Sequence, residues 1–153
     1  MKRIAATLIF FLAACHGARS GVTSVPGQGA IAVLVIPNPI VVRHVSGDTY
    51  EFPFDVDVRE TGGRPVNVTR VTATVFGPGG INVGSEGWDA EKIRGMGYST
   101  SIPANGELRY HFAPRRSVSD DRVFNTLSAE LKAEAVDDTG VPASATAAVT
   151  VRR

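Results

Sequence analysis

The sequence predicts an all-β protein, folded as a two-layer β-sandwich. Valine occurs 20 times and leucine only 6 times, and β-branched side chains suit the pleated surface of a strand better than a helix. Several segments alternate between apolar and polar residues, with turns rich in Gly, Pro and Asp between them. Seven or eight short strands at this spacing are typical of a sandwich with Greek-key connections.

Composition and charge exclude several classes of protein. The chain has 153 residues, 43% of them hydrophobic, which is too apolar for a disordered chain. A formal net charge of +1 leaves no basic excess for binding nucleic acid. The single cysteine excludes a disulfide scaffold and a cysteine-rich metal site.

The N-terminus has the pattern of a secretory signal. Basic residues Lys2 and Arg3 precede an uncharged apolar run over residues 4–14. This run is shorter than the roughly 20 residues that a membrane-spanning helix needs, and it fits the apolar region of a signal peptide. An ordinary secretory signal, cleaved near residues 18–20, is the alternative interpretation.

The end of this run, Leu12, Ala13, Ala14 and Cys15, resembles the lipobox of bacterial lipoproteins. The resemblance implies a signal peptide over residues 1–14 and a lipid attached to Cys15 once the signal is removed. His16 rather than Asp follows the cysteine, and in Gram-negative lipoproteins this favours the outer membrane over retention in the inner membrane.

We expect a tether over residues 15–30 and one domain over residues 31–153. The tether segment is rich in Gly, Ser and Thr without periodicity, so it should behave as a flexible coil that reaches roughly 20 Å. The remaining residues are enough for one domain with its own core and no disulfide.

The first half of the domain alternates most clearly. Strands are predicted over residues 31–36 and 40–45, and then over residues 50–59. In this third strand the apolar side chains share the inner face: Tyr50, Phe52, Phe54, Val56 and Val58. Asp55 and Asp57 then point outward, and Pro53 predicts an edge or a bulge, because proline lacks an N–H donor.

After a turn over residues 61–65, a strand over residues 66–75 changes register at Thr69 and Arg70, which predicts a β-bulge. Residues 77–80 end this strand. The middle segment is less regular, with a short strand around Ile81 and Val83 and one helical turn over residues 89–92 within an irregular stretch.

The second half ends in a hairpin. Strands are predicted over residues 108–112, 127–135 and 145–151, and the Asp-Asp-Thr-Gly stretch at 137–140 makes the hairpin turn between the last two.

Residues 54–75, with their Arg-Glu-Thr-Gly-Gly turn, and the hairpin over residues 127–151 resemble the immunoglobulin-like and fibronectin-type-III-like domains of bacterial envelope proteins. The resemblance implies an immunoglobulin-like Greek-key sandwich. Two departures leave the family open: the chain lacks a Cys–Trp–Cys framework, and it carries Tyr50 and Phe52 where fibronectin-like domains usually bury a tryptophan.

Little in the sequence predicts catalysis. His16, His44 and His111 lie in no metal-binding spacing, and no nucleophile elbow or phosphate loop is present. Asp55 with Asp57, and the Asp pair at 137–138, would bind calcium only if they converged, so we interpret them as a solvated strand face and a turn. We therefore expect no enzyme activity, no metal and no cofactor.

Trp88 is the most informative single residue. It lies among Gly, Ser and Glu residues rather than in an alternating strand, and an exposed ring on such a loop could stack on a sugar or anchor a protein. Tyr98 is near enough in sequence to join it. The alternative interpretation is that Trp88 folds back and caps the open end of the sandwich.

The sequence thus predicts a non-enzymatic envelope lipoprotein, held at the membrane through lipidated Cys15, that acts as a structural or protein-interaction module. A carbohydrate-binding or adhesion module that uses Trp88 and Tyr98 is the alternative. The protein or glycan partner is not identified by the sequence, and nucleic acid is not expected.

Overall fold

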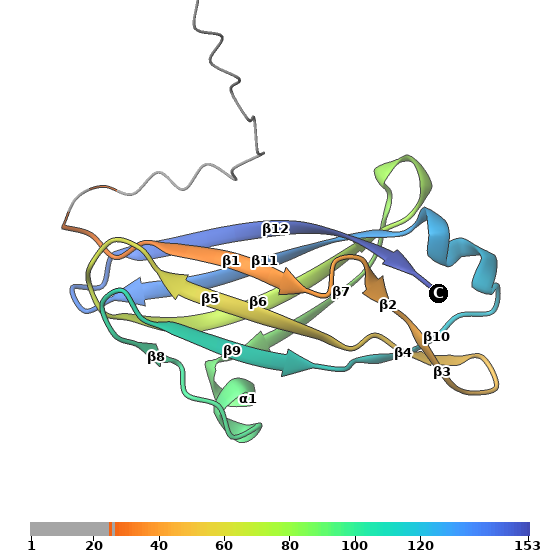
Figure 1. Ribbon diagram of the computed structural model, residues 1–153, viewed down its shortest axis with the longest axis horizontal. Coiled ribbons are helices and arrows are strands. Elements are labelled where there is room, and N and C mark those ends of the chain that lie inside the picture. The colour runs from red at the N-terminus through yellow and green to blue at the C-terminus, as the bar shows by residue number, and fades with distance from the viewer. Residues whose placement is uncertain (1–24, 26) are drawn as a thin grey trace, which may run out of the picture.

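The computed structural model describes residue 25 and residues 27–153. The predicted signal peptide, the lipobox and most of the predicted tether lie outside the described residues. The described part folds into two face-to-face sheets along a common long axis, with the C-terminus at one end (Figure 1).

Strands dominate the domain, with one short α-helix and two 3₁₀ segments between them. The elements in chain order are β1 (Ile31–Ile36), β2 (Ile40–Val41), β3 (Arg43–Ser46), β4 (Thr49–Glu51), β5 (Phe54–Glu60), β6 (Val66–Phe76), η1 (Pro78–Gly80), β7 (Asn82–Asp89), α1 (Ala90–Gly95), β8 (Ser101–Ile102), β9 (Glu107–Phe112), β10 (Arg115–Ser117), η2 (Asp121–Thr126), β11 (Ser128–Asp137) and β12 (Pro142–Arg152).

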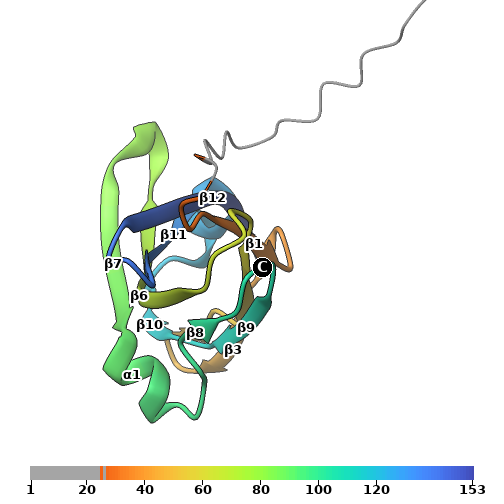
Figure 2. The ribbon, with the colours of Figure 1, turned by 90° about the vertical axis from the view of Figure 1, so that its left-hand side faces the viewer.

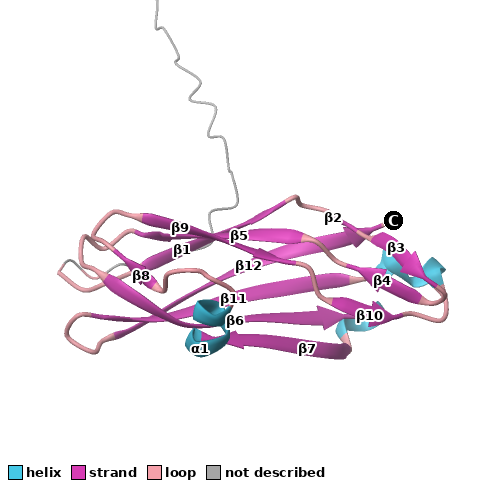
Figure 3. Cartoon of the chain, turned by 90° about the horizontal axis from the view of Figure 1, so that it is seen from below, coloured by secondary structure: helices cyan, strands magenta, loops and turns pink. Residues whose placement is uncertain are grey.

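The sheet order is that of an immunoglobulin-like sandwich, as the sequence predicts. One sheet has the order β1-β5-β9, and the larger sheet has the order β2-β12-β11-β6-β7, with β8 also paired to β6. A small third sheet, β10-β4-β3, extends one end of the domain. The view along the long axis shows the two layers enclosing the core between them (Figure 2), and the view from below shows the strands running along its length (Figure 3).

The alternation in residues 50–59 places four of the five predicted residues in the core, and the fifth, Phe52, is partly buried. Val56 and Val58 are fully buried and Phe54 is 3% exposed, while the side chains between them face outward. The chain leaves the ladder at Phe52 and Pro53, so the single predicted strand is two strands, β4 and β5. The proline therefore interrupts the strand, as its missing donor requires.

The predicted bulge in β6 is confirmed. Arg70 pairs with Glu134 and Val68 pairs with Ala135, so Thr69 is the extra residue in β6. Its hydroxyl donates to the backbone carbonyl of Glu134 at 3.1 Å. The bulge restores Val66, Val68 and Val71 to the inner face, where each is at most 1% exposed.

One expectation is wrong, and two short strands were not predicted. The stretch around Trp88 is not a loop, because residues 82–89 form β7 along β6. The two strands that were not predicted are β8 and β10. The polar and glycine-rich sequences of these strands carry no alternation, and their pairing with distant strands supplies the order that local pattern lacks.

Packing of the domain begins just before β1. The N–H of Gly29 donates to the carboxylate of Asp137 at 3.1 Å, and Ala30 is 7% exposed. A Cβ atom on Gly29 would lie 2.6 Å from the Cβ of Asp137, so only glycine fits at this approach. Among the described residues, hydrogen bonds to the domain extend back to Gly27, whose carbonyl accepts from the guanidinium of Arg64 at 3.2 Å.

Candidate functional site

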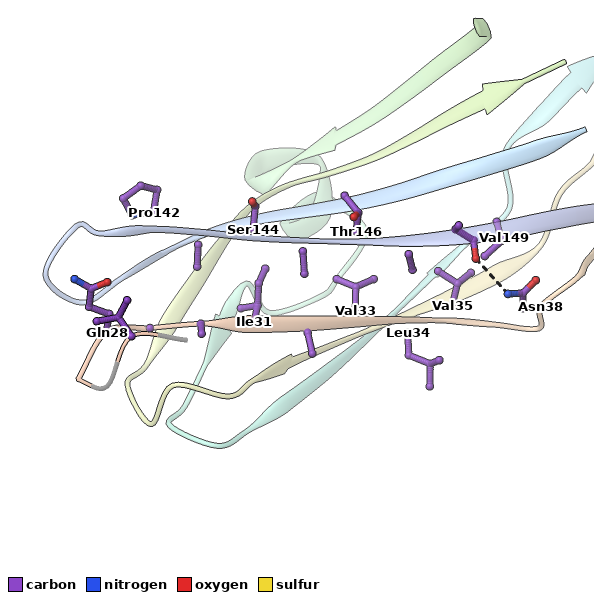
Figure 4. A pocket seen from close by; sticks show the side chains of 18 residues that line it. Gln28, Ile31, Val33, Leu34, Val35, Asn38, Pro142, Ser144, Thr146 and Val149 are labelled. Carbon is purple, nitrogen blue, oxygen red and sulfur yellow. Dashed lines mark hydrogen bonds between the residues drawn. The ribbon is translucent and has the colours of Figure 1, made fainter. Parts of the chain in front are cut away.

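A groove runs along the side of the domain where the two sheets meet without hydrogen bonding to one another. Strand β1 is the edge of one sheet, and most of β12 is the edge of the other. The space between them, which we call the seam, has a volume of about 840 Å³ and is lined by residues 28–35 and 142–149 together with Val25 and Asn38 (Figure 4).

The edge of β12 is covered at one end only. Ile40 and Val41 of β2 pair with Val151 and Arg152. Next to them, the side chain of Asn38 donates to the carbonyl of Ala148 and accepts from the N–H of Thr150, both at 3.3 Å. The Asn38 amide thereby takes the place of one residue of a neighbouring strand.

The rest of this edge is open. Since the N–H of Thr150 faces Asn38, residues in the same phase, Ser144, Thr146 and Ala148, direct their N–H groups away from β11. The ladders and hydrogen bonds of residues 25 and 27–153 give these three N–H groups no partner. An edge of this kind is a template for a further strand.

Strand β1 presents a second open edge to the seam. The carbonyl of Ala30 accepts from Thr61 N–H at 2.8 Å, so Ala32 and Leu34 also face β5 in the ladder. The backbone groups of Val33 and Val35 therefore point away from β5, along the open edge of β1. Figure 4 shows the side chains of these two valines pointing toward β12.

The walls of the seam are uncharged and have small side chains. None of the described residues that line it is charged. Ala143, Ala145 and Ala147 of β12 are only partly buried and pack against the core, and Leu34 on the outer side of β1 is 58% exposed. Natural edge strands are commonly protected by charged side chains or by proline, and residues 142–149 of β12 carry no charge and one proline, Pro142.

The outer face of the β1-β5-β9 sheet is charged, in contrast to the seam. Three cross-strand pairs of polar side chains lie side by side in register on β5 and β9, and two of them are pairs of opposite charge. They are Asp55 with His111 at 2.7 Å, Asp57 with Arg109 at 2.5 Å, and Arg59 with Glu107 at 3.0 Å. The charges on this face are therefore satisfied within the sheet.

The predicted carboxylate pairs do not converge on a metal site. Asp137 accepts from its own turn and from Gly29, and Asp138 pairs with Arg64 at 2.9 Å. Within the part of the chain that the structure describes, no three His, Cys, Asp or Glu side chains form a group that could hold a metal ion. His44 and His111 are exposed, and His16 lies outside the described residues.

Trp88 is in the core rather than at the surface. It is 8% exposed and stacks on Phe112, with ring centroids 4.2 Å apart. Its burial agrees with the second interpretation of this residue, although it reaches the core from strand β7 and not from a loop. Tyr98 packs edge-on against Tyr110, and its hydroxyl accepts from the N–H of His111 at 3.3 Å. Sugar binding by these two rings stays a prediction.

Sequence reasoning did not find the seam or Asn38. Asn38 lies more than one hundred residues from its partners on β12, so no local pattern connects them. The one available signal was the absence of charge in residues 142–149, which sets this strand apart from β5, β9 and β11.

Comparisons with known proteins give a likeness of fold. No family model matches the chain, and no curated protein matches it. The structure of structural genomics target SoR45 matches with a TM-score of 0.55 at 10% identity, over 84% of this chain and 90% of that one. The putative ApaA protein from Bordetella pertussis matches with a TM-score of 0.54 at 12% identity, over 85% of this chain and 98% of that one.

A third solved structure, the CARDB domain of the PF1109 protein from Pyrococcus furiosus, matches with a TM-score of 0.38 at 15% identity, over 87% of this chain and 95% of that one. At these identities the first two structures bear on the fold alone and leave the function open. No helix among the described residues is both long enough and apolar enough to cross a membrane.

Proposed function

We propose that this chain is a non-enzymatic lipoprotein of a bacterial envelope, and that its immunoglobulin-like domain binds a protein partner by strand addition along the seam. The open edge of β12 is the observation that carries this proposal. Its free N–H groups at Ser144, Thr146 and Ala148 can donate to an extended segment of another protein, as in other complexes formed by β-strand addition.

The lining of the seam specifies the chemistry of the partner. With no charged residue along it, an incoming strand with charged side chains on its inner face would lose their hydration without gaining a partner. Ala145, Ala147 and Val33 leave room for small or medium apolar side chains. The occupant is therefore an extended, uncharged segment with apolar residues at alternate positions.

The anchor and the location are part of the same proposal. The lipobox ending in Cys15 would hold the domain at the membrane, with the outer membrane favoured by His16. The absence of a catalytic constellation in the sequence is the reason to propose binding rather than catalysis.

Photocrosslinking in intact cells tests the proposal. A photoreactive amino acid at Thr146 should crosslink to one partner, and mass spectrometry of the product identifies the attached segment. The same probe at Thr72, on the outer face of the central strand β6, is the matched control. The identified segment, made as a peptide, should then bind the purified chain.

The binding mode is tested with Thr146→Pro, which removes one free N–H of the edge without adding a charge. We expect affinity for the peptide to fall about tenfold, the effect of losing one to two hydrogen bonds. Equal affinity for the wild-type chain and Thr146→Pro, or equal crosslinking from Thr72, would contradict strand addition at this edge.

A further inference from the structure

A second cavity lies between the larger sheet and β10, toward the end of the domain where the C-terminus lies (Figure 1). It has a volume of about 230 Å³, and most of its lining is apolar. The side chains of Phe52, Val75, Val118 and Leu127 face into it and are only partly buried. An apolar cavity of about 150 Å³ is enough to take up benzene, so the volume of this one is sufficient for a phenyl or branched alkyl group.

The mouth of the cavity carries one ion pair. Of the described residues that line the cavity, only Glu86 of β7 and Arg116 of β10 are charged, and the guanidinium of Arg116 donates to the carboxylate of Glu86. Their side chains are 32% and 55% exposed, so the pair lies at the rim and not in the core. Arg116 also donates to the carbonyl of Arg115 at 2.7 Å.

Glu86 lies in the inward-facing phase of its strand, two residues before the buried Trp88. A carboxylate in this phase is costly unless it is paired, and Arg116 pairs with it across two strands that share no backbone hydrogen bonds. The two side chains thus place one positive and one negative group side by side over an apolar cavity.

We propose that this cavity binds a small zwitterion with an apolar side chain, that is, a free α-amino acid such as phenylalanine or leucine. The carboxylate of the ligand would pair with Arg116, its ammonium group would pair with Glu86, and its side chain would fill the cavity. This site is separate from the seam, and the inference does not rest on strand addition.

Charge complementarity selects the zwitterion over related ligands. A ligand with only a carboxylate pairs with Arg116 but is repelled by Glu86. A ligand with only an ammonium group pairs with Glu86 but is repelled by Arg116. A neutral apolar molecule buries its surface in the cavity but forms no charge-assisted hydrogen bond at the rim. A zwitterion replaces one exposed ion pair with two charge-assisted pairs, and such hydrogen bonds are stronger than neutral ones.

Calorimetric titration with four ligands tests this inference. The protein is the full chain with the substitution Cys15→Ser, which prevents lipidation. The ligands are L-phenylalanine, 3-phenylpropionate, 2-phenylethylamine and 2-phenylethanol, which share the ring and differ in charge. We expect phenylalanine to bind about tenfold more tightly than each of the other three, a difference of about 1.4 kcal/mol. Equal affinities for all four, or no binding by any of them, would contradict the inference.

Variants that remove one charge of the rim should bind one of the singly charged ligands more tightly than the wild type does. An ion pair with a purely structural role would not produce such a gain. Glu86→Gln removes the repulsion for an anion, so it should bind 3-phenylpropionate several-fold more tightly than the wild type does and phenylalanine less tightly. Arg116→Gln should change the preference in the same way toward 2-phenylethylamine. An unchanged order of the four ligands in both variants would contradict the assignment of the rim.

Two further variants separate binding from folding. Glu107→Gln removes a carboxylate of the same kind from the outer face of β9, where it pairs with Arg59, and should leave all four affinities unchanged. Ala129→Leu fills the cavity from β11, where Ala129 is 5% exposed, and should abolish binding of phenylalanine. Undiminished phenylalanine binding by a folded Ala129→Leu chain would place the ligand elsewhere and overturn the inference.

Discussion

Glu60 shows how single buried groups hold the loops at the end of the domain where β1 begins. It is 1% exposed, and its carboxylate accepts from the backbone N–H groups of Gly62, Gly63 and Asn105 at 2.6, 3.0 and 2.8 Å, and from Ala30 at 3.4 Å. Burial by itself raises the pKa of Glu60, but these hydrogen bonds together outweigh it and lower the pKa below its ordinary value.

We expect Glu60→Gln to lower the free energy of unfolding at pH 7 by roughly 2–3 kcal/mol, because an amide cannot accept from all of these donors. A carboxylate with a lowered pKa stabilises the fold above its unfolded pKa of about 4.3, and this contribution is lost as the pH falls through the folded pKa. Urea unfolding at pH 7 and at pH 3 should therefore show a smaller difference between variant and wild type at pH 3. Exposed Glu107→Gln is the control, and a Glu60→Gln difference that is equal at both pH values would contradict this role.

Tyr110 is a fully buried polar residue whose hydroxyl, unlike the carboxylate of Glu60, has no hydrogen-bond partner among the described residues. Desolvation raises the pKa of Tyr110 to about 12. We expect Tyr110→Phe to leave the stability unchanged or to raise it by about 1 kcal/mol, because the hydroxyl loses its hydration on folding without a partner in return. A loss of more than about 1 kcal/mol in urea unfolding would reveal a partner for this hydroxyl.

At the scale of elements, β12 combines a paired side with an open side. The N–H of Val151 donates to Leu127, so residues in its phase, Ala145 among them, direct their N–H groups toward β11. Ala145→Pro removes a ladder hydrogen bond and should cost about 2 kcal/mol or more. Thr146→Pro removes only an N–H that faces the seam, so thermal unfolding of this variant should occur close to the wild-type temperature. Equal losses in the two variants would mean that both sides of β12 are paired.

Local pattern predicted the elements whose inner and outer faces differ in polarity. The burial of Val56 and Val58 in β5, the bulge at Thr69 and the final hairpin all follow from alternation that is visible in the sequence. Strand β7 was predicted only at its start, around Ile81 and Val83, because Gly84, Ser85 and Gly87 give no alternation, and the order of the rest comes from pairing with β6. Where strong alternation is absent, partner strands decide the structure.

The candidate sites depend on contacts that no sequence window contains. The seam joins the first and last long strands, and the second cavity brings Glu86 of β7 next to Arg116 of β10. The sequence placed Trp88 on a loop for the same reason: its stacking partner, Phe112, lies on a different sheet. Fold class was thus predictable from composition and alternation, whereas the surfaces available for binding were not.

At the scale of the whole molecule, the proposal predicts that a lipid on Cys15 determines where the domain acts. Cell fractionation of a tagged chain should find the wild type with the membranes and Cys15→Ala in the soluble fraction, because the variant lacks the thiol that receives the lipid. Cys15→Ser is a second test with the same expectation. A membrane-bound Cys15→Ala chain would contradict lipid anchoring, while the seam and its binding test would be unaffected.

Native-state hydrogen exchange of residues 142–150 in the purified chain tests the open edge most directly. If β12 presents an unpaired side, the amides of Ala145 and Ala147 exchange slowly and those of Ser144 and Thr146 exchange quickly, and the latter two become protected when the crosslinked segment is added as a peptide. Slow exchange at Ser144 and Thr146 in the isolated chain, or no added protection on binding, would contradict strand addition along the seam.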